Sequence, residues 1–350
     1  MAPADAISWS AARRVADRVL PREHFSQSYL REGVDAELVD VTRQAEGIAE
    51  SVTGLIAPSR ADVLPVSRHQ WVAVNIASAR RLLSPLSDAM SRRRRSAASA
   101  VGSVVSGSEV GAVLGWMSGR VLGQYDPLLH PESMDRQDVL YYVVPNVLEM
   151  EKRYAFPPRQ FRLWVAVHEC THRLQFWSAP WVGPHLRATI GMLIDSFSAE
   201  PRALSDMAKN VADGLRDRDG RRGGVATLAL SPEQRKIVDD LAGMMALFEG
   251  HAEVAMSRID PSIAPDIERF HRVVRERRRQ RGAAGALQRL LGIDAKLRQY
   301  ADGERFVRAV DAAGGTSLLN EVWSGPSMLP SLQEVREPER WLQRARGSSV

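Results

Sequence analysis

The sequence predicts a mainly α-helical protein with a small β element, folded as one domain over residues 1–350. Apolar residues recur at three- and four-residue steps through most of the chain, which is typical of amphipathic helices. Only residues 138–145 have the short length and the β-branched and aromatic content of a strand. We expect an N-terminal helical part (1–130), a metal-binding core (138–258) and a C-terminal helical part (262–350). With 44% hydrophobic residues, a chain of this length can bury a large core.

The first helices follow from this periodicity. Amphipathic patterns cover residues 8–20, 35–55 and 68–90. Residues 96–127 then carry a glycine at every fourth position, from Gly107 to Gly123. A four-residue step places small residues on one face of a helix, so that a second backbone can approach closely.

The same glycine-rich segment is nearly long enough to span a bilayer, and it follows a run of arginines. Glu109 and six serines argue against a membrane span. We therefore interpret residues 96–127 as one buried helix, or two broken ones, and expect no stable insertion into membranes.

The middle of the chain contains clear start and stop signals. Pro145 should end the strand, and a short helix is expected over 146–156. A helix opened by Pro158 should run to about Trp177. Further predictions are a helix over 184–211, a loop over 213–224, a capping box with Ser231 before a helix over 232–256, and more helices from 262 onward.

Composition limits the location and the partners. Cys170 is the single cysteine, which excludes an internal disulfide and suits a reducing compartment. The N-terminal residues lack the apolar core of a signal peptide, so we expect a cytoplasmic protein. The net charge of +5 and the arginine runs at 92–95 and 275–281 are not accompanied by any nucleic-acid-binding motif. We expect no nucleic acid partner, and the oligomeric state is left open.

Residues 168–172 read HECTH, within an otherwise apolar segment. Positions four apart share one face of a helix, so His168 and His172 can direct their imidazoles at one metal ion. The adjacent Glu169 lies at the flank of such a site. There it would act as the general base toward a zinc-activated water, while Cys170 and Thr171 are packing residues.

A catalytic zinc needs a third protein ligand. The extended pattern with a later glycine and a third histidine fails, because Gln175 and Ser178 occupy those positions. The helix expected over 232–256 offers Glu249, which we interpret as the third ligand, with His251 and Glu253 as alternatives. Three weaker candidates are His185, Asp239 and Asp240.

Glu249 and Glu253 are four residues apart and so share a helix face. This spacing suits a ligand followed by a carboxylate that orients a ligand imidazole. It resembles the glutamate helix of gluzincins. No residue stands out as a donor to a developing oxyanion; Tyr141, Tyr142, Tyr300 and His251 are possible, although each is better explained as structural.

The chain as a whole resembles a bacterial family of zincin-like, gluzincin-type proteins described as zinc-dependent metalloproteases or hydrolases. Some members carry the label coenzyme F420 biosynthesis-associated. The matching stretches follow one another in order and include VVPNVLEMEKRYAFPPRQFRLWVAVHECTHRLQFW (143–177), LFEGHAEVAM (247–256), LLGIDAKLRQYADGERFV (290–307) and LNEVWSGPSMLPSLQEVREPERW (319–341).

The resemblance implies a mostly helical fold around a minimal gluzincin core. It implies that His168, His172 and Glu249 bind Zn²⁺ and that Glu169 is the catalytic acid and base. The expected function is a zinc-dependent metallohydrolase, most simply a peptidase, acting on a peptide or another amide-containing substrate. The alternative is a zinc-containing binding or scaffold protein without turnover, which would tolerate Glu169→Gln.

Overall fold

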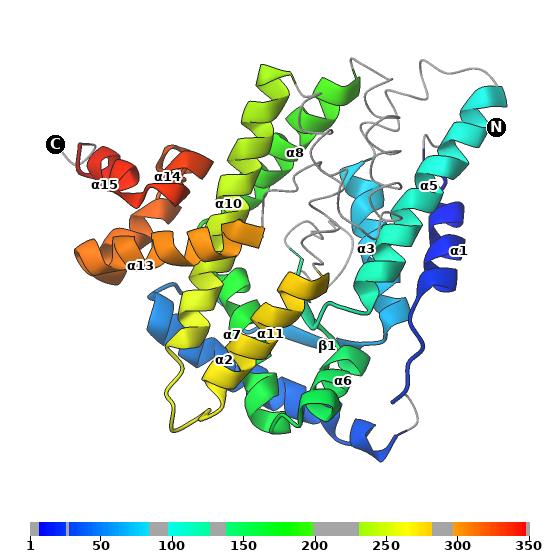
Figure 1. The fold of residues 1–350 in the computed structure, drawn as a ribbon, viewed down its shortest axis with the longest axis horizontal. Coiled ribbons are helices and arrows are strands. Elements are labelled where there is room, and N and C mark those ends of the chain that lie inside the picture. Colours follow the sequence, from blue (N-terminus) through cyan, green and yellow to red (C-terminus); the bar gives the residue numbers. More distant parts are fainter. Residues whose placement is uncertain are drawn as a thin grey trace.

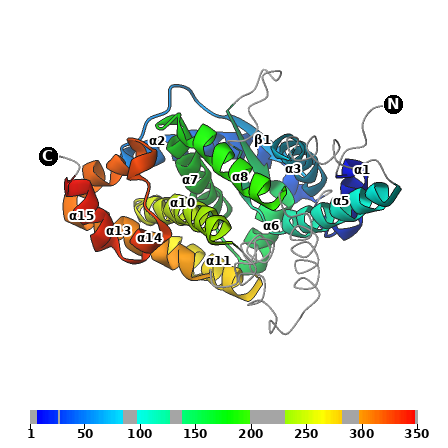
Figure 2. The ribbon, with the colours of Figure 1, turned by 90° about the horizontal axis from the view of Figure 1, so that it is seen from above.

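The computed structural model describes residues 7–25, 28–83, 97–126, 138–198, 231–281 and 297–347. Within these ranges the chain is mainly helical, with a small sheet near its centre (Figures 1 and 2), which confirms the predicted fold class. The helices are α1 (Trp9–Val19), α2 (Val34–Thr53), α3 (Arg68–Leu82), α5 (Ala97–Ser118), α6 (Val144–Tyr154), α7 (Pro158–Trp177), α8 (Val182–Ser198), α10 (Pro232–Ser257), α11 (Ile267–Arg281), α13 (Leu297–Asn320), α14 (Leu332–Arg336) and α15 (Pro338–Gly347).

The sheet has three strands in the order β1 (Asp62–Val66), β3 (Val139–Val143) and β2 (Gly123–Tyr125). β1 runs parallel to β3, and β2 runs antiparallel to it. The strand expected over 138–145 is β3, which ends earlier because Val144 and Pro145 already form the first turn of α6. β1 and β2 were not predicted; β1 contains Pro65, which is tolerated because β1 is an edge strand.

The helix starts follow the predicted signals. Ser231 caps α10 in a capping box with Gln234, and Pro158 occupies the first turn of α7. Several predictions concern residues outside the described ranges: the loop over 213–224, the arginine run at 92–95 and most of the expected helix beyond Ser198.

The prediction of helix over residues 96–127 is wrong at its C-terminal end, because the helix, α5, ends at Ser118 and Gly123 begins β2. α5 packs along α1 (Figures 1 and 2). A β-carbon at Gly111 would lie 2.8 Å from the carbonyl carbon and the Cα of Ala12. Gly107 and Gly115 meet the α1 backbone in the same way, at Ser8 and Ala16. The predicted close backbone approach is therefore found. In the part of the chain that is described, no helix is both long enough and apolar enough to cross a membrane.

α7 lies in the middle of the fold, between α2 and α10 (Figure 2). Its buried face joins the main hydrophobic core, where the rings of Phe156, Phe161 and Phe270 lie within 5.5 Å of one another. Buried charges add directional contacts. Arg173 binds Asp138, beside β3, at 2.8 Å and Glu46 of α2 at 3.2 Å. These bonds fix α7 against the sheet and α2.

Candidate metal centre

α7 carries the HECTH residues on its path through the core. His168 and His172 are four positions apart, and their side chains are 15% and 16% exposed. The rest of this helical turn is buried. Because the backbone is held on both sides, the two imidazoles share one fixed direction, toward α10.

α10 carries Glu249 at the point where it crosses α13. A β-carbon at Gly250 would lie 2.6 Å from the backbone nitrogen of Glu304, so only glycine permits this crossing. Gly303 of α13 is equally constrained, since its β-carbon would lie 2.8 Å from the carbonyl carbon of Ala246. The crossing fixes the backbone beside Glu249.

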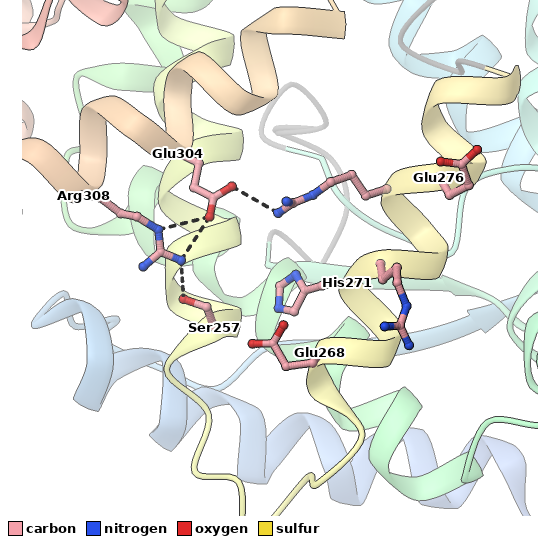
Figure 3. Close-up of a pocket in the computed structure, with 8 residues that line it drawn as sticks. Ser257, Glu268, His271, Glu276, Glu304 and Arg308 are labelled. Carbon is pink, nitrogen blue, oxygen red and sulfur yellow. Dashed lines mark hydrogen bonds and ion pairs between the residues drawn. The ribbon is translucent and has the colours of Figure 1, made fainter.

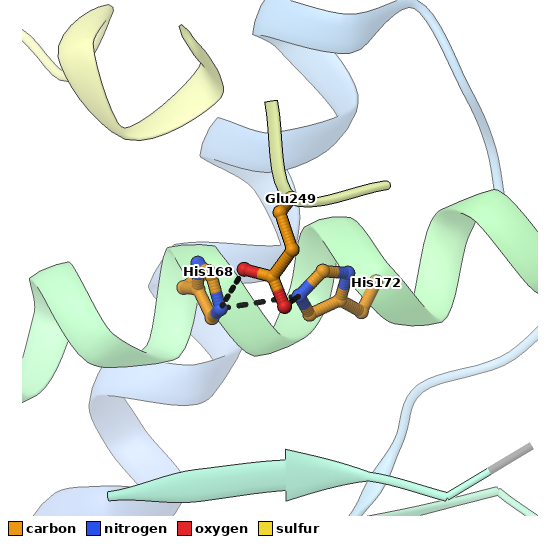
Figure 4. Close-up of side chains that lie close together, drawn as sticks. All are labelled: His168, His172 and Glu249. Atoms are coloured by element: carbon orange, nitrogen blue, oxygen red, sulfur yellow. Dashed lines mark hydrogen bonds and ion pairs between the residues drawn. The ribbon is translucent and has the colours of Figure 1, made fainter. Parts of the chain in front are cut away.

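The three predicted ligands converge (Figure 4). The Nε2 atoms of His168 and His172 are 3.1 Å apart. Glu249 places Oε2 3.8 Å from His168 Nε2 and Oε1 4.0 Å from His172 Nε2. A tetrahedron with metal–ligand bonds of about 2.0–2.2 Å has edges of about 3.3–3.6 Å. The residues therefore fit a zinc ion with one vertex left open, after shifts of a few tenths of an ångström.

Within the described ranges, these three residues form the one group of three or more histidine, cysteine or acidic side chains spaced to hold a metal ion. Of the alternatives considered for the third ligand, Glu249 is the one found beside the two imidazoles.

Glu169 lies against the sheet and is 5% exposed. Its Oε2 accepts a hydrogen bond of 3.2 Å from the backbone N–H of Tyr125 in β2. A β-carbon at Gly123 would lie 2.7 Å from Glu169 Oε1, so a larger residue at this position of β2 would displace the carboxylate. The carboxylate has a defined position, and its role as general base stays a prediction.

Gln175 of α7 and His251 of α10 contact each other between the two ligand helices, 3.2 Å apart. Gln175 is fully buried and accepts a hydrogen bond of 3.0 Å from His172 Nδ1. The His251 ring is 5.6 Å from that of Trp323. Complete burial, and then the proximity of His172 and Arg258, lower the pKa of His251 to about 3, so this imidazole is neutral at neutral pH.

The sequence interpretation overlooked Gln175 as a functional residue. It entered only as the residue that breaks the pattern of a third histidine farther along the helix. Its position three residues after His172, on the same helical face, was the available signal.

Glu253 is buried one turn beyond Glu249. Its Oε1 accepts hydrogen bonds from His271 Nδ1 at 3.0 Å and from Arg275 at 3.1 Å. The other nitrogen of His271 lies 3.4 Å from Nε1 of Trp164, one turn before His168 on α7. Glu253 thus ties α10 to α11, and the predicted support of a ligand imidazole stays a prediction.

The weaker candidates lie elsewhere. Asp240 pairs with Lys236 at 2.8 Å, and His185 packs its ring 5.9 Å from that of Trp181. Neither these two residues nor Asp239 belongs to the metal-binding group identified within the described ranges.

The tyrosines considered as oxyanion donors have different surroundings. The hydroxyl of Tyr142 is buried and shares a hydrogen bond of 2.9 Å with Thr42. Burial, and then the charge of Asp126, raise the pKa of Tyr141 above its ordinary value. The side chain of Tyr300 lies outside the described part of the structure.

A polar pocket of about 400 Å³ lies beyond the Glu253–His271 pair (Figure 3). Arg275 of α11 binds Glu304 of α13 across it at 3.1 Å, and Arg308, one turn along α13, binds the same carboxylate at 3.1 Å, so the charges of the pocket largely neutralise one another. The lining residues come from α10, α11 and α13 and are Ser257, Glu268, His271, Arg272, Arg275, Glu276, Glu304 and Arg308.

Comparisons with known proteins show the family to which the chain belongs. The sequence model of the zincin-like metallopeptidase family matches residues 7–342. A crystal structure from Chloroflexus aurantiacus, described as "a putative hydrolase with a novel fold", superimposes with a TM-score of 0.72 at 27% identity, covering 97% of this chain and 98% of that one. No curated protein matches the sequence. Because the family match spans nearly the whole chain, the protein belongs to the zincin-like metallopeptidase family.

Proposed function

We propose that this protein is a zinc-dependent metallohydrolase, most simply a peptidase. One observation carries the proposal: His168, His172 and Glu249 bring three ligand atoms from two helices to within 4.8 Å of one another. Nitrogen and carboxylate ligands in this number are those of a catalytic zinc, which keeps a fourth position for water or substrate. Membership of a metallopeptidase family supports a peptide or another amide-containing molecule as the substrate.

When bound, zinc supplies a Lewis acid that polarises a carbonyl group and makes water acidic near neutral pH. His168 and His172 would bind as neutral ligands, whereas Glu249 would contribute one negative charge. We assign the proton transfer to Glu169, which follows His168 directly and has its carboxylate fixed by the Tyr125 N–H. It would accept a proton from water and return it to the leaving amine.

The ligand set is tested by metal analysis of the purified protein beside His172→Ala and Glu249→Ala. We expect about one zinc per chain in the wild type and loss of zinc from both variants. Asp240→Ala, on the same helix as Glu249, is the matched control. Asp240 pairs with exposed Lys236, so this variant should keep its zinc. Full zinc occupancy in either ligand variant would contradict the assignment.

A non-catalytic zinc protein is the second candidate, and the near-complete burial of Glu169 favours it. Glu169→Gln separates the two. If the protein is an enzyme, zinc should be retained and turnover of a substrate found by screening should fall by about a hundredfold or more. If it is a scaffold, zinc content, stability and phenotype should all stay unchanged.

A further inference from the structure

The buried amide of Gln175 contacts both helices that carry the metal ligands. On α7, its Oε1 lies 3.0 Å from His172 Nδ1. On α10, its Nε2 donates to the backbone carbonyl of Phe248 at 3.0 Å and lies 3.2 Å from His251 Nδ1. Phe248 and His251 stand on either side of Glu249 in the sequence. One side chain therefore reaches a ligand on α7 and the immediate neighbours of the ligand on α10.

The chemistry of these partners fixes where each proton lies. The carbonyl of Phe248 can only accept, so the atom of Gln175 that faces it must be the NH₂ group. The amide oxygen then faces His172, and because it can only accept, Nδ1 of His172 must carry the proton. The lone pair of His172 is consequently on Nε2, the atom directed at His168 and Glu249.

The second N–H of the amide has a defined partner as well. It points at Nδ1 of His251, which must therefore be the unprotonated nitrogen of that ring. All of the hydrogen-bonding capacity of the Gln175 NH₂ group is used, between a main-chain carbonyl and an imidazole of α10. The amide cannot flip without losing these bonds, so the orientation toward His172 is stable.

We propose that Gln175 is a positioning residue of the metal centre, which holds His172 in the tautomer that can bind a metal and fixes α10 relative to α7. The inference rests on the proposed zinc centre and adds a residue to it. Without an acceptor at Nδ1, His172 would also populate the tautomer with its proton on Nε2. That tautomer has no lone pair on Nε2, the nitrogen that faces the site, so zinc binding would require the proton to move to Nδ1.

Two variants separate the acceptor from the packing. Gln175→Met keeps an unbranched side chain of similar length but removes the acceptor, and Gln175→Glu retains an acceptor for His172. The matched control is Thr171→Val, which removes another buried polar group of α7, one that donates to the Val167 carbonyl at 2.8 Å. Thermal unfolding of each metal-free variant shows how much general destabilisation each change causes.

Two measurements test the proposal. The first is the dissociation constant for Zn²⁺, determined by competition with a chromophoric chelator. We expect a loss of about 10–100-fold in Gln175→Met, a smaller loss in Gln175→Glu, which keeps the acceptor for His172 but not the donor to Phe248, and no change in Thr171→Val. The second is the tautomer of His172 in the metal-free wild type, from ¹⁵N shifts of histidine-labelled protein, with His172→Gln used for assignment.

We expect the wild-type proton on Nδ1 and a mixture of tautomers in Gln175→Met. A wild-type proton on Nε2 would overturn the proposal even if no variant folds, and so would unchanged zinc affinity in Gln175→Met. Both results differ from failure of the proposed function, which would appear as zinc retained by His172→Ala and Glu249→Ala. The tautomer measurement does not depend on zinc and reports on Gln175 in either case.

Discussion

The contact between α1 and α5 gives a quantitative test of the fold, through Gly111→Ala. The added carbon would lie 2.8 Å from two backbone carbons of Ala12, whereas carbon atoms at optimal separation are about 3.5–4.0 Å apart. The helices must therefore separate by about 1 Å. Overpacking costs up to about 3 kcal/mol, and the better helix propensity of alanine returns about 1. We expect a net loss of about 2 kcal/mol in the free energy of unfolding.

Gly47→Ala is the matched control, because a β-carbon at this position in α2 has no atom within 4 Å. Here the helix propensity acts alone, and we expect a gain of up to about 1 kcal/mol. Urea unfolding followed by circular dichroism measures both changes, and hydrogen exchange should quicken in α1 only in Gly111→Ala. If Gly111→Ala is as stable as Gly47→Ala, the close backbone contact is refuted.

Three further outcomes are expected. Burial raises the pKa of Glu334, but hydrogen bonds from Arg344 and Ser331 outweigh it and lower the pKa below 4.5. The resulting stabilisation is present above pH 4.5 and is lost as the pH falls. Glu334→Gln should therefore lower the free energy of unfolding in urea by about 1–2 kcal/mol at pH 7 and by progressively less in acid. Glu339→Gln, at an exposed position, is the control and should not show this loss. Burial raises the pKa of Cys170 well above 9.0, so a thiol reagent should modify it only on unfolding, and rapid labelling of native protein would contradict this. Free zinc at about 1,000 times its dissociation constant should raise the unfolding free energy by about 4 kcal/mol in calorimetry, and Glu249→Ala should remove most of this gain.

The features that the sequence predicted well depend on local spacing. The helical period predicted that the two imidazoles share one face of α7, and the capping box at Ser231 predicted the start of α10. The four-residue glycine step predicted the close approach to another backbone, although not its partner, α1. In each case, residues within one or two helical turns determine the structure, so the local sequence is sufficient to predict it.

The features that were missed depend on contacts between distant segments. β2 has three residues and exists only because β3 pairs with it, and β1 contains a proline that weakens any strand prediction. Gln175 resembles an ordinary buried polar residue until α10 is placed beside it. Glu249 was chosen among three candidates on α10 because of its spacing to Glu253, yet the contacts of Glu253 lead to His271 on α11.

The three ligand atoms owe their positions to contacts spread over the whole chain. α7 is fixed by buried pairs of Arg173 with α2 and with the residue before β3, and α10 is fixed by the Gly250–Gly303 crossing with α13. The amide of Gln175 then joins the two helices at the ligands themselves. A loss at any of these contacts would move a ligand without removing it. A site built in this way depends on α2, α7, α10 and α13 together, and all four helices lie within residues 7–342, which the family model matches.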